Sequence, residues 1–223
     1  MQNPPAGPAR RLRVMARAAV DRGEASRRRV AKPADERRED LLAAARRVFA
    51  EKGLPNATIS DVTEAAGVAK GTFYLHFDSK EALLGALKQR FVDDLVSRAL
   101  QLYTTVGHDD WWALADVTVE SMIDYLLEHR DLIQVFARDG FQPQSAALFG
   151  DASGKLRNMF AAGIKAGTEA GAFDATDPVL TATFLDHAIH GTVEHAVLYE
   201  GGIDREYLVA GAKDLLRRVL RGT

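Results

Sequence analysis

Two short helical segments joined by a tight turn, within Thr58–Glu81, constrain this chain more than any other feature of its sequence. Thr58 and Asp61 have the spacing of a capping box, so a helix is expected to begin there. Gly67 can adopt the left-handed conformation that often ends a helix. A second helix is expected over about Lys70–Phe77. Helix, short glycine-containing turn and helix is the layout of a DNA-binding helix-turn-helix.

The expected second helix has one apolar face and one polar face. Phe73 and Phe77 lie four residues apart, so they share a face that must be buried. Gly71, near the helix N-terminus, allows the backbone to approach a phosphate closely. Leu75 would be exposed unless it meets an apolar group such as a thymine methyl. The predicted DNA-contacting residues are Thr58, Lys70, Gly71, Thr72, Tyr74, Leu75 and His76.

These segments resemble the TetR family of transcriptional regulators, and the resemblance covers about sixty residues, Glu36–Val96. The family usually has a small hydroxyl residue just after the Gly-Val turn, where this chain has Ala69. That change removes a side-chain N-cap worth about 1 kcal/mol. The matching segments are Arg38–Phe49, Lys52-Gly53, Ala57–Ile59, Ala66–Val68, Lys70–Tyr74, His76-Phe77 and Ser79–Leu84.

The resemblance implies a function and a domain organisation. It implies a helix-turn-helix domain at residues 36–96, with the motif at about 59–78, and a helical effector-binding and dimerisation domain at residues 97–223. Lys80 resembles a phosphate contact of the family. The implied partners are a palindromic double-stranded DNA operator, a small apolar effector and a second copy of the chain. The implied protein is a repressor, not an enzyme, that leaves its operator when the effector binds.

The charge distribution agrees with a nucleic acid partner at one end of the chain. Residues 1–90 carry 18 Lys/Arg and 11 Asp/Glu, a net +7, whereas residues 91–223 carry 11 and 20, a net −9. Residues 1–34, rich in Pro and Arg, are predicted to be a disordered basic arm, which is either a DNA contact or a flexible tail. No apolar run approaches the ~20 residues that cross a bilayer, so a cytoplasmic protein without membrane contact is expected.

Helical periodicity extends through the remainder of the chain, and no strand pattern interrupts it, so an all-α fold is predicted. The region Gly140–Gly154 is expected to be a loop or partial helix. The expected helices are Asp35–Lys52, one from Ser79 to about Tyr103, Trp111–Glu128, Arg130–Asp139, Lys155–Ala170, one from Pro178 to about Tyr199, and a last helix capped by Asp204.

The helix from Ser79 is long enough to begin in the DNA-binding domain and finish in the second domain, which makes it the expected mechanical link. Around it, aromatic and aliphatic residues are candidates for an apolar ligand pocket. Most apolar residues of this kind fill a protein core and do not line a pocket. The candidates are Phe91, Leu95, Leu102, Trp111, Met122, Tyr125, Phe136, Phe160, Phe184 and His187.

The helix Val179–Leu198 is apolar nearly all round, so it must be covered on two sides. One side can face the core of its own chain. In the resembling family the last two helices pair with their copies in a four-helix bundle, so a homodimer through these helices is expected. The alternative is a larger monomeric core.

Two functions of other classes stay open at this stage. His187, His190 and Glu194 share one helix face at a spacing that suits a metal, which would permit a small-molecule or metal-dependent enzyme with its site in Asp186–His195. No metal ligand set or cofactor is predicted, because such groups are more often hydrogen-bonded core residues. The second alternative is a ligand-free architectural DNA-binding protein. It predicts weak sequence preference and no cavity.

Overall fold

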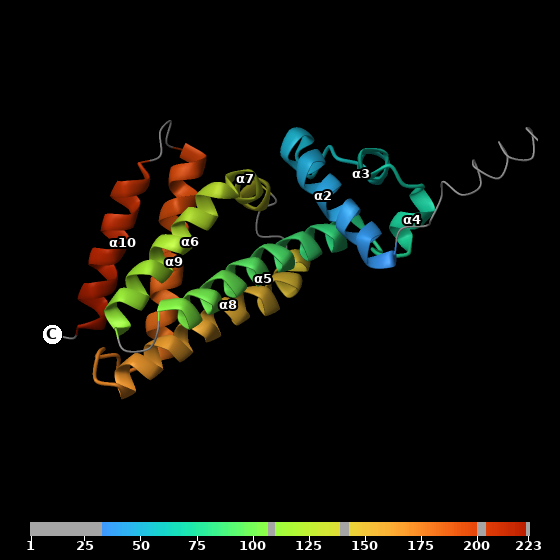
Figure 1. Cartoon of the computed structure of the whole chain (residues 1–223). Helices are drawn as coiled ribbons and strands as arrows, with labels where there is room; N and C mark the ends of the chain where they lie inside the picture. Colours follow the sequence, from blue (N-terminus) through green and yellow to red (C-terminus); the bar gives the residue numbers. More distant parts are fainter. Residues whose placement is uncertain (1–32, 107–109, 139–142, 200–203, 222–223) are drawn as a thin grey trace, which may run out of the picture. The chain divides into compact units, whose positions relative to one another are not determined.

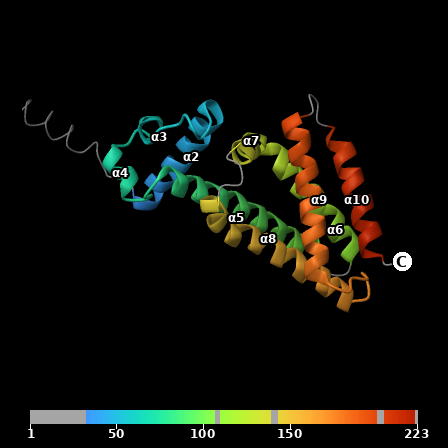
Figure 2. The ribbon, with the colours of Figure 1, turned by 180° about the vertical axis from the view of Figure 1, so that it is seen from behind.

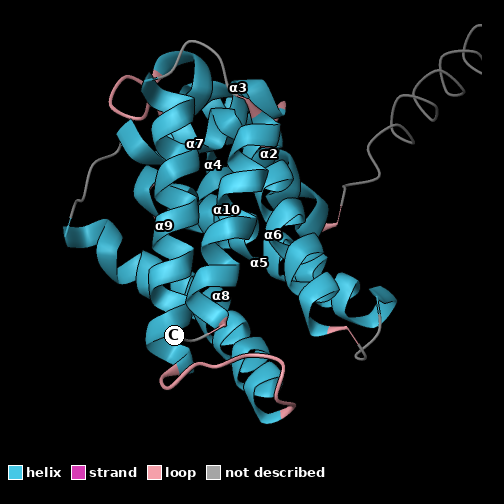
Figure 3. Cartoon of the chain, turned by 90° about the vertical axis from the view of Figure 1, so that its left-hand side faces the viewer, coloured by secondary structure: helices cyan, strands magenta, loops and turns pink. Residues whose placement is uncertain are grey.

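The computed structural model describes residues 33–106, 110–138, 143–199 and 204–221. Within these ranges every regular element is a helix and no strand occurs, which confirms the all-α prediction (Figure 3). The helices are α2 (Ala34–Lys52), α3 (Ile59–Ala66), α4 (Lys70–Tyr74), α5 (Lys80–Val106), α6 (Trp111–Glu128), α7 (Arg130–Arg138), α8 (Pro143–Glu169), α9 (Pro178–Tyr199) and α10 (Arg205–Leu220).

The chain divides into two compact units, residues 1–39 and 40–223. Of the first unit the structure describes residues 33–39, where the amide of Arg37 donates to the carbonyl of Pro33 at 3.2 Å as α2 begins. The predicted basic arm, residues 1–34, lies almost wholly outside the described residues. No helix in the described part of the chain has the length and apolar character needed to cross a membrane.

The first part of the second unit is a small helical domain with an apolar interior. Side chains from α2, α3, α4 and the N-terminal half of α5 share its core. Leucine, valine and phenylalanine recur at helical spacing in these segments. Each helix therefore has one apolar stripe, and these stripes meet at the centre of the domain. Completely buried side chains include Leu41, Phe49, Val62, Phe73 and Leu83.

Two boundaries in this domain differ from the sequence prediction. Helix α4 ends at Tyr74 rather than Phe77, because the amides of Leu75 and His76 turn to carbonyls three residues back and so tighten the last turn. Helix α5 begins at Lys80 rather than Ser79, because Ser79 is its cap: the Ser79 hydroxyl accepts from the amide of Ala82 at 3.1 Å.

The remaining helices and the C-terminal half of α5 pack into a bundle. Helix α5 packs along α8, α8 packs along α9, and α6 contacts α5, α9 and α10 (Figures 1 and 2). A row of ion pairs joins α6 to α10. Arg205 binds Glu120 at 2.8 Å, Lys213 binds the same carboxylate at 2.7 Å, and Arg217 pairs with Asp116.

The prediction of a loop or partial helix over Gly140–Gly154 is wrong for most of that segment. Helix α8 begins at Pro143 and continues through it, while Gly140 lies outside the described residues. Proline is well tolerated in the first turn of a helix, and an interior glycine costs only about 1 kcal/mol. Packing of α8 along two neighbouring helices outweighs that cost.

Gly167 and Gly171 fix the C-terminal end of α8. Gly171 has φ = 73°, and this left-handed residue turns the chain back so that the amides of Ala172 and Phe173 both reach the carbonyl of Gly167. The ring of Phe173 then lies directly on Gly167, where a Cβ atom would be 2.3 Å from the ring. The ring also meets Trp112 edge to face, with centroids 5.0 Å apart.

Replacing Gly167 by Ala should therefore destabilise the protein by about 1–3 kcal/mol, since the buried Phe173 ring must move to admit the methyl group. Urea unfolding followed by circular dichroism measures this change. Gly163→Ala is the matched control, because it lies one turn earlier on α8 and its Cβ would meet nothing within 4 Å. Equal stability of the two variants would contradict the assigned role of Gly167.

Candidate nucleic-acid interface and ligand cavity

The turn between α3 and α4 has the geometry that its sequence predicts. The hydroxyl of Thr58 accepts from the amide of Asp61 at 3.1 Å, and the Asp61 carboxylate accepts from the Thr58 amide at 2.9 Å, which completes the capping box. Gly67 is left-handed, with φ = 67°. Ala69 is the N-cap of α4 and provides no side-chain hydrogen bond.

Ion pairing reinforces the start of α3. The ammonium of Lys52 lies 2.7 Å from Asp61 Oδ1. This hydrogen bond, followed by those from the backbone and hydroxyl of Thr58, lowers the pKa of Asp61 to about 2. The carboxylate therefore remains ionised at neutral pH and keeps both helix-capping contacts.

Helix α4 separates its residues into a buried face and an exposed face. Phe73 is completely buried, and its ring lies 5.9 Å from that of Phe77, as the four-residue spacing predicts. On the opposite face Tyr74 is 52% exposed and Leu75 is 78% exposed. Of the other predicted DNA-contacting residues, Thr58, Lys70 and Gly71 are exposed, while Thr72 and His76 are half-buried.

The structure gives Lys80 a different role from the phosphate contact that the family resemblance implies. Its ammonium donates to the carbonyls of Leu54 and Ala57 at 2.6 and 3.0 Å, and so closes the connection between α2 and α3 onto the start of α5. Two of its three N–H donors are thereby used inside the protein. A spacing argument cannot reveal this, because the acceptors lie 26 and 23 residues away.

A cavity of about 620 Å³ lies among α5, α6, α8, α9 and α10. Its volume is within the range of small-molecule sites, and its wall is almost wholly apolar. This finding argues against the ligand-free architectural alternative, which requires no cavity. Residues that form the wall include Val96, Leu100, Tyr103, Trp111, Leu114, Thr118, Met122, Phe160, Gly163, Phe173, Leu185, Asp186, Ile189 and Leu216.

Three of the predicted pocket residues, Trp111, Met122 and Phe160, line this cavity. Several residues that sequence reasoning missed share helical spacing with Trp111 and Met122: Leu114, Ala115 and Thr118 lie on the same face of α6. That spacing is the signal that would have found them.

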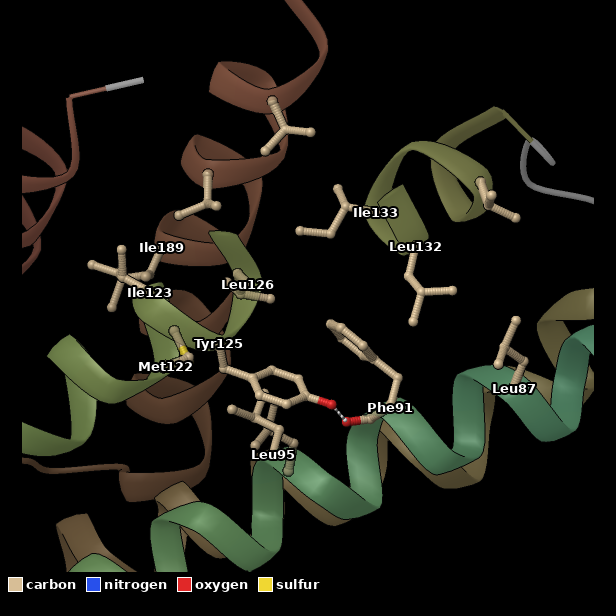
Figure 4. Close-up of a cluster of buried hydrophobic side chains, with 14 of the residues drawn as sticks. Leu87, Phe91, Leu95, Met122, Ile123, Tyr125, Leu126, Leu132, Ile133 and Ile189 are labelled. Carbon is tan, nitrogen blue, oxygen red and sulfur yellow. Dashed lines mark hydrogen bonds between the residues drawn. The ribbon is translucent and has the colours of Figure 1, made fainter. Parts of the chain in front are cut away.

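Phe91, Tyr125 and Phe136, also predicted as pocket residues, are not among the residues that line this cavity. They form a separate aromatic cluster, in which the Phe91 ring lies 5.0 Å from Tyr125 and 5.6 Å from Phe136. Figure 4 shows Phe91 and Tyr125 of this cluster. The Tyr125 hydroxyl donates to the carbonyl of Phe91 at 3.0 Å, and its burial raises the pKa of Tyr125 to about 12. These rings fill the space between α5, α6 and α7, with Leu95 beside them. Leu102 is half-buried on α5 but forms no part of the cavity wall.

Phe184 and His187 do not line this cavity, because they lie on the outer face of α9, where His187 lines a second pocket. Phe184 is 66% exposed, and His187 is exposed with its Nδ1 2.8 Å from the carbonyl of Thr183. One α-helical residue corresponds to about 100° of rotation, so Phe184 points nearly opposite to Asp186. The inner face of α9 is formed by Ala182, Leu185, Asp186 and Ile189.

The proposed metal set on α9 does not assemble. His190 and Glu194 approach to 4.0 Å, while His187 is bound to its own helix backbone. Within the described ranges, no group of three or more His, Cys, Asp or Glu residues is arranged to hold a metal ion. The structure therefore offers no support for the metal-dependent enzyme alternative.

An ion pair joins helix α2 to helix α7. Nε and Nη2 of Arg46, on α2, donate to the two carboxylate oxygens of Asp131, on α7, at 2.6 and 2.8 Å. The hydrogen bonds from Arg46 overcome the desolvation of Asp131 and keep the pKa of this carboxyl below its usual value. The partners are 85 residues apart, so sequence reasoning had no signal for this contact.

Comparison with known proteins places the first part of the chain in a family. Residues 41–87 match the model described as bacterial regulatory proteins, tetR family. The transcriptional repressor KstR2 of Rhodococcus jostii is 44% identical over 62 residues, which are 28% of this chain and 30% of KstR2. The transcriptional activator FasR of Mycolicibacterium smegmatis is 42% identical over 98 residues, 44% of this chain and 43% of FasR. The chain thus spans less than half the length of these relatives.

Solved structures extend the similarity beyond the first domain. The transcriptional regulator FadR of Bacillus subtilis, in complex with stearoyl-CoA, superposes with a TM-score of 0.71 over 80% of this chain and 96% of FadR. At 21% identity this likeness shows the fold alone. Together with the turn geometry of α3 and α4, the match of residues 41–87 shows that the chain carries the helix-turn-helix domain of the tetR family of bacterial regulatory proteins, which are transcriptional regulators.

Proposed function

We propose that this protein is a dimeric transcriptional repressor that leaves its DNA operator when a small apolar molecule occupies the cavity. The observation that carries this proposal is the shared helix α5, whose N-terminal half belongs to the core of the DNA-binding domain and whose C-terminal half walls the cavity. The proposed domains are residues 36–96 for DNA and 97–223 for effector binding and dimerisation. The proposed location is the cytoplasm, where the DNA partner lies.

The exposed face of α4 is the proposed reading surface. Lys70, Gly71 and Thr72 lie at its N-terminal end, where free backbone amides favour phosphate oxygens. Tyr74 and His76 suit phosphate contact, and Leu75 provides an exposed apolar group for a thymine methyl. The net positive charge of residues 1–90 would attract the DNA without specifying its sequence.

Two contacts support coupling between the cavity and the reading surface. The hydrogen bond from Tyr125 to the Phe91 carbonyl holds α6 against the middle of α5. The pair of Arg46 with Asp131 holds α2 against α7. A ligand that binds better when α5 is displaced would increase the population of a conformer in which both contacts are altered. The affinity for DNA would fall because this conformer binds DNA less well.

The sign of regulation is proposed from the family resemblance. KstR2 is a repressor and FasR is an activator, so both signs occur among the relatives. FadR of Bacillus subtilis binds stearoyl-CoA, which agrees with a long apolar ligand in this fold.

The proposed dimer uses the outer faces of α9 and α10. On α9, Phe184 and Tyr199 are 66% and 75% exposed, and on α10 Tyr207 is 77% exposed. A groove beside them is lined by small or polar residues such as Gly191 and Thr192. Large apolar side chains left in water on two adjacent helices favour a partner with the same surface.

The operator proposal is tested by selecting bound sequences from random DNA at controlled salt. We expect a palindrome whose half-site centres are about 34–36 Å apart. Lys70→Met should weaken operator binding and reduce the salt slope by about 1, with the free energy of unfolding changed by less than about 0.5 kcal/mol. Lys80→Met should instead lower that free energy by about 1–3 kcal/mol, because two carbonyls lose their donor. Unchanged DNA binding by Lys70→Met would remove α4 as the reading surface.

The coupling proposal is tested with Asp131→Asn, which keeps the side-chain volume but removes the charge opposite Arg46. The effector is first found by screening against the selected operator. The measured quantity is the operator affinity without effector divided by the affinity with saturating effector. We expect this ratio to be about 5–150 in the wild type and severalfold lower in Asp131→Asn. Asp94→Asn, in an exposed pair within α5, is the control and should leave the ratio unchanged. If both variants behave like the wild type, the ion pair does not transmit the signal.

The dimer proposal is tested with Phe184→Glu, measured by light scattering coupled to size-exclusion chromatography. The new charge should be buried at the interface and convert the dimer into monomers at micromolar concentration, since an unpaired buried charge costs several kcal/mol. Leu75→Glu alters an equally exposed apolar residue in the DNA-binding domain and should leave the mass unchanged. A wild-type monomer, or a Phe184→Glu dimer, would rule out this interface.

A further inference from the structure

One acidic side chain stands out in the wall of the apolar cavity. Among the described residues that line it there is no Lys, Arg, His or Glu, and Asp186 is the one that bears a formal charge when ionised. Its neighbours on the inner face of α9 are Ala182, Leu185 and Ile189. The opposite wall presents Trp111, Met122 and other apolar groups of α6.

Asp186 lacks a direct partner in the described part of the protein. No described residue donates a hydrogen bond to its carboxylate or forms an ion pair with it. His190, His187 and Arg157 act on it only through longer-range electrostatics. Burial outweighs these three groups, so the pKa of Asp186 lies above its usual value.

A carboxylate in such a place has unmet hydrogen-bonding capacity. Burying a charged group is costly unless it is paired and hydrogen-bonded. A ligand without a hydrogen-bond donor would leave this cost in place, a neutral O–H or N–H donor would reduce it in part, and an anionic group would add repulsion between like charges. A ligand with a protonated nitrogen would remove the cost, because it supplies both a positive charge and N–H donors at short range.

The cavity also defines the body of the ligand. Its lining residues on α6 extend from Trp111 to Met122, which corresponds to about 16 Å along the helix axis. Gly163, on α8, leaves open space at the wall, since a Cβ there would meet nothing within 4 Å. An elongated apolar group therefore fits the remaining volume.

We propose that the cavity selects an elongated apolar molecule with one protonated nitrogen, whose ammonium group lies against Asp186. This inference rests on the proposed function of the cavity as the effector site and specifies the chemistry of its ligand. The proposed ligand class differs from that of a regulator that binds a fatty acid or a fatty acyl anion through a cationic group in its cavity wall. The described lining residues of this cavity provide no such group.

The test compares three probes with the same ten-carbon chain, decylammonium, decanol and decanoate, at neutral pH and below their micelle concentrations. Binding to the full chain is measured by calorimetry and by the fluorescence of Trp111, which lines the cavity. We expect decylammonium to bind at least about tenfold more tightly than decanoate, with decanol between them. Decanoate binding as tightly as decylammonium to the wild-type protein would overturn the inference without any variant.

Asp186→Asn should remove the preference, so that decylammonium and decanoate bind within about threefold of each other. Glu194→Gln makes the same change of charge two turns later on α9, outside the cavity wall, and should retain the wild-type ratio. A preference that survives in Asp186→Asn, or disappears in Glu194→Gln, would assign it to another part of the surface.

These measurements contain no DNA, so they separate the ligand chemistry from the proposed function. If decylammonium binds as expected but does not alter operator affinity, the ligand class is correct and the release mechanism is wrong. If another class of ligand binds and releases the operator, the proposed function survives and the role of Asp186 is wrong.

Discussion

The two-ended packing of α5 is the constraint on which the remaining structure depends. Near the start of α5 the buried residues are Leu83, Leu84 and Leu87, and they share a core with α2, α3 and α4. The orientation of α4, the proposed reading helix, therefore follows from that of α5. Its last turns form part of the cavity wall through Val96 and Tyr103. A helix is stiff along its axis because every interior peptide group is hydrogen-bonded within it, so a displacement at one end is carried to the other. This arrangement would give the proposed ligand-dependent change in DNA binding a direct mechanical route.

The cavity exists because large side chains near it are held away from its centre. Phe173 is fixed over Gly167 by the left-handed turn at Gly171, and the ring of Tyr125 is fixed by its hydrogen bond to α5. Interiors normally pack at the density of organic crystals, so an open volume of about 620 Å³ needs rigid surroundings. The ion pairs between α6 and α10 provide part of that rigidity. The proposed role of Asp186 is to give this otherwise apolar space one electrostatic preference.

Helix α9 resolves a difficulty that its sequence presents. A helix that is apolar on all sides requires cover on all sides, and the bundle of one chain covers only the face of Ala182, Leu185 and Ile189. The opposite face leaves Phe184 and Tyr199 in water. The same helix therefore serves two proposed functions, with the ligand on its inner face and the second subunit on its outer face. Binding at one face can thus affect the other.

The sequence by itself determined the features that depend on local spacing: the helices, the capping box at Thr58 and Asp61, the left-handed Gly67, and the buried pair of Phe73 and Phe77. These succeed because hydrogen bonds and helical periodicity act over a few residues. It located helix α4 for the same reason, and it named three residues of the cavity wall.

Only the tertiary structure decided which aromatic residues surround a cavity and which fill a core, because that difference depends on the distance between helices rather than on the pattern within one. It alone paired Arg46 with Asp131, 85 positions apart, directed Lys80 to backbone carbonyls, and placed Asp186 without a described partner in an apolar wall. Such contacts join residues that are remote in the chain, and no local periodicity encodes them.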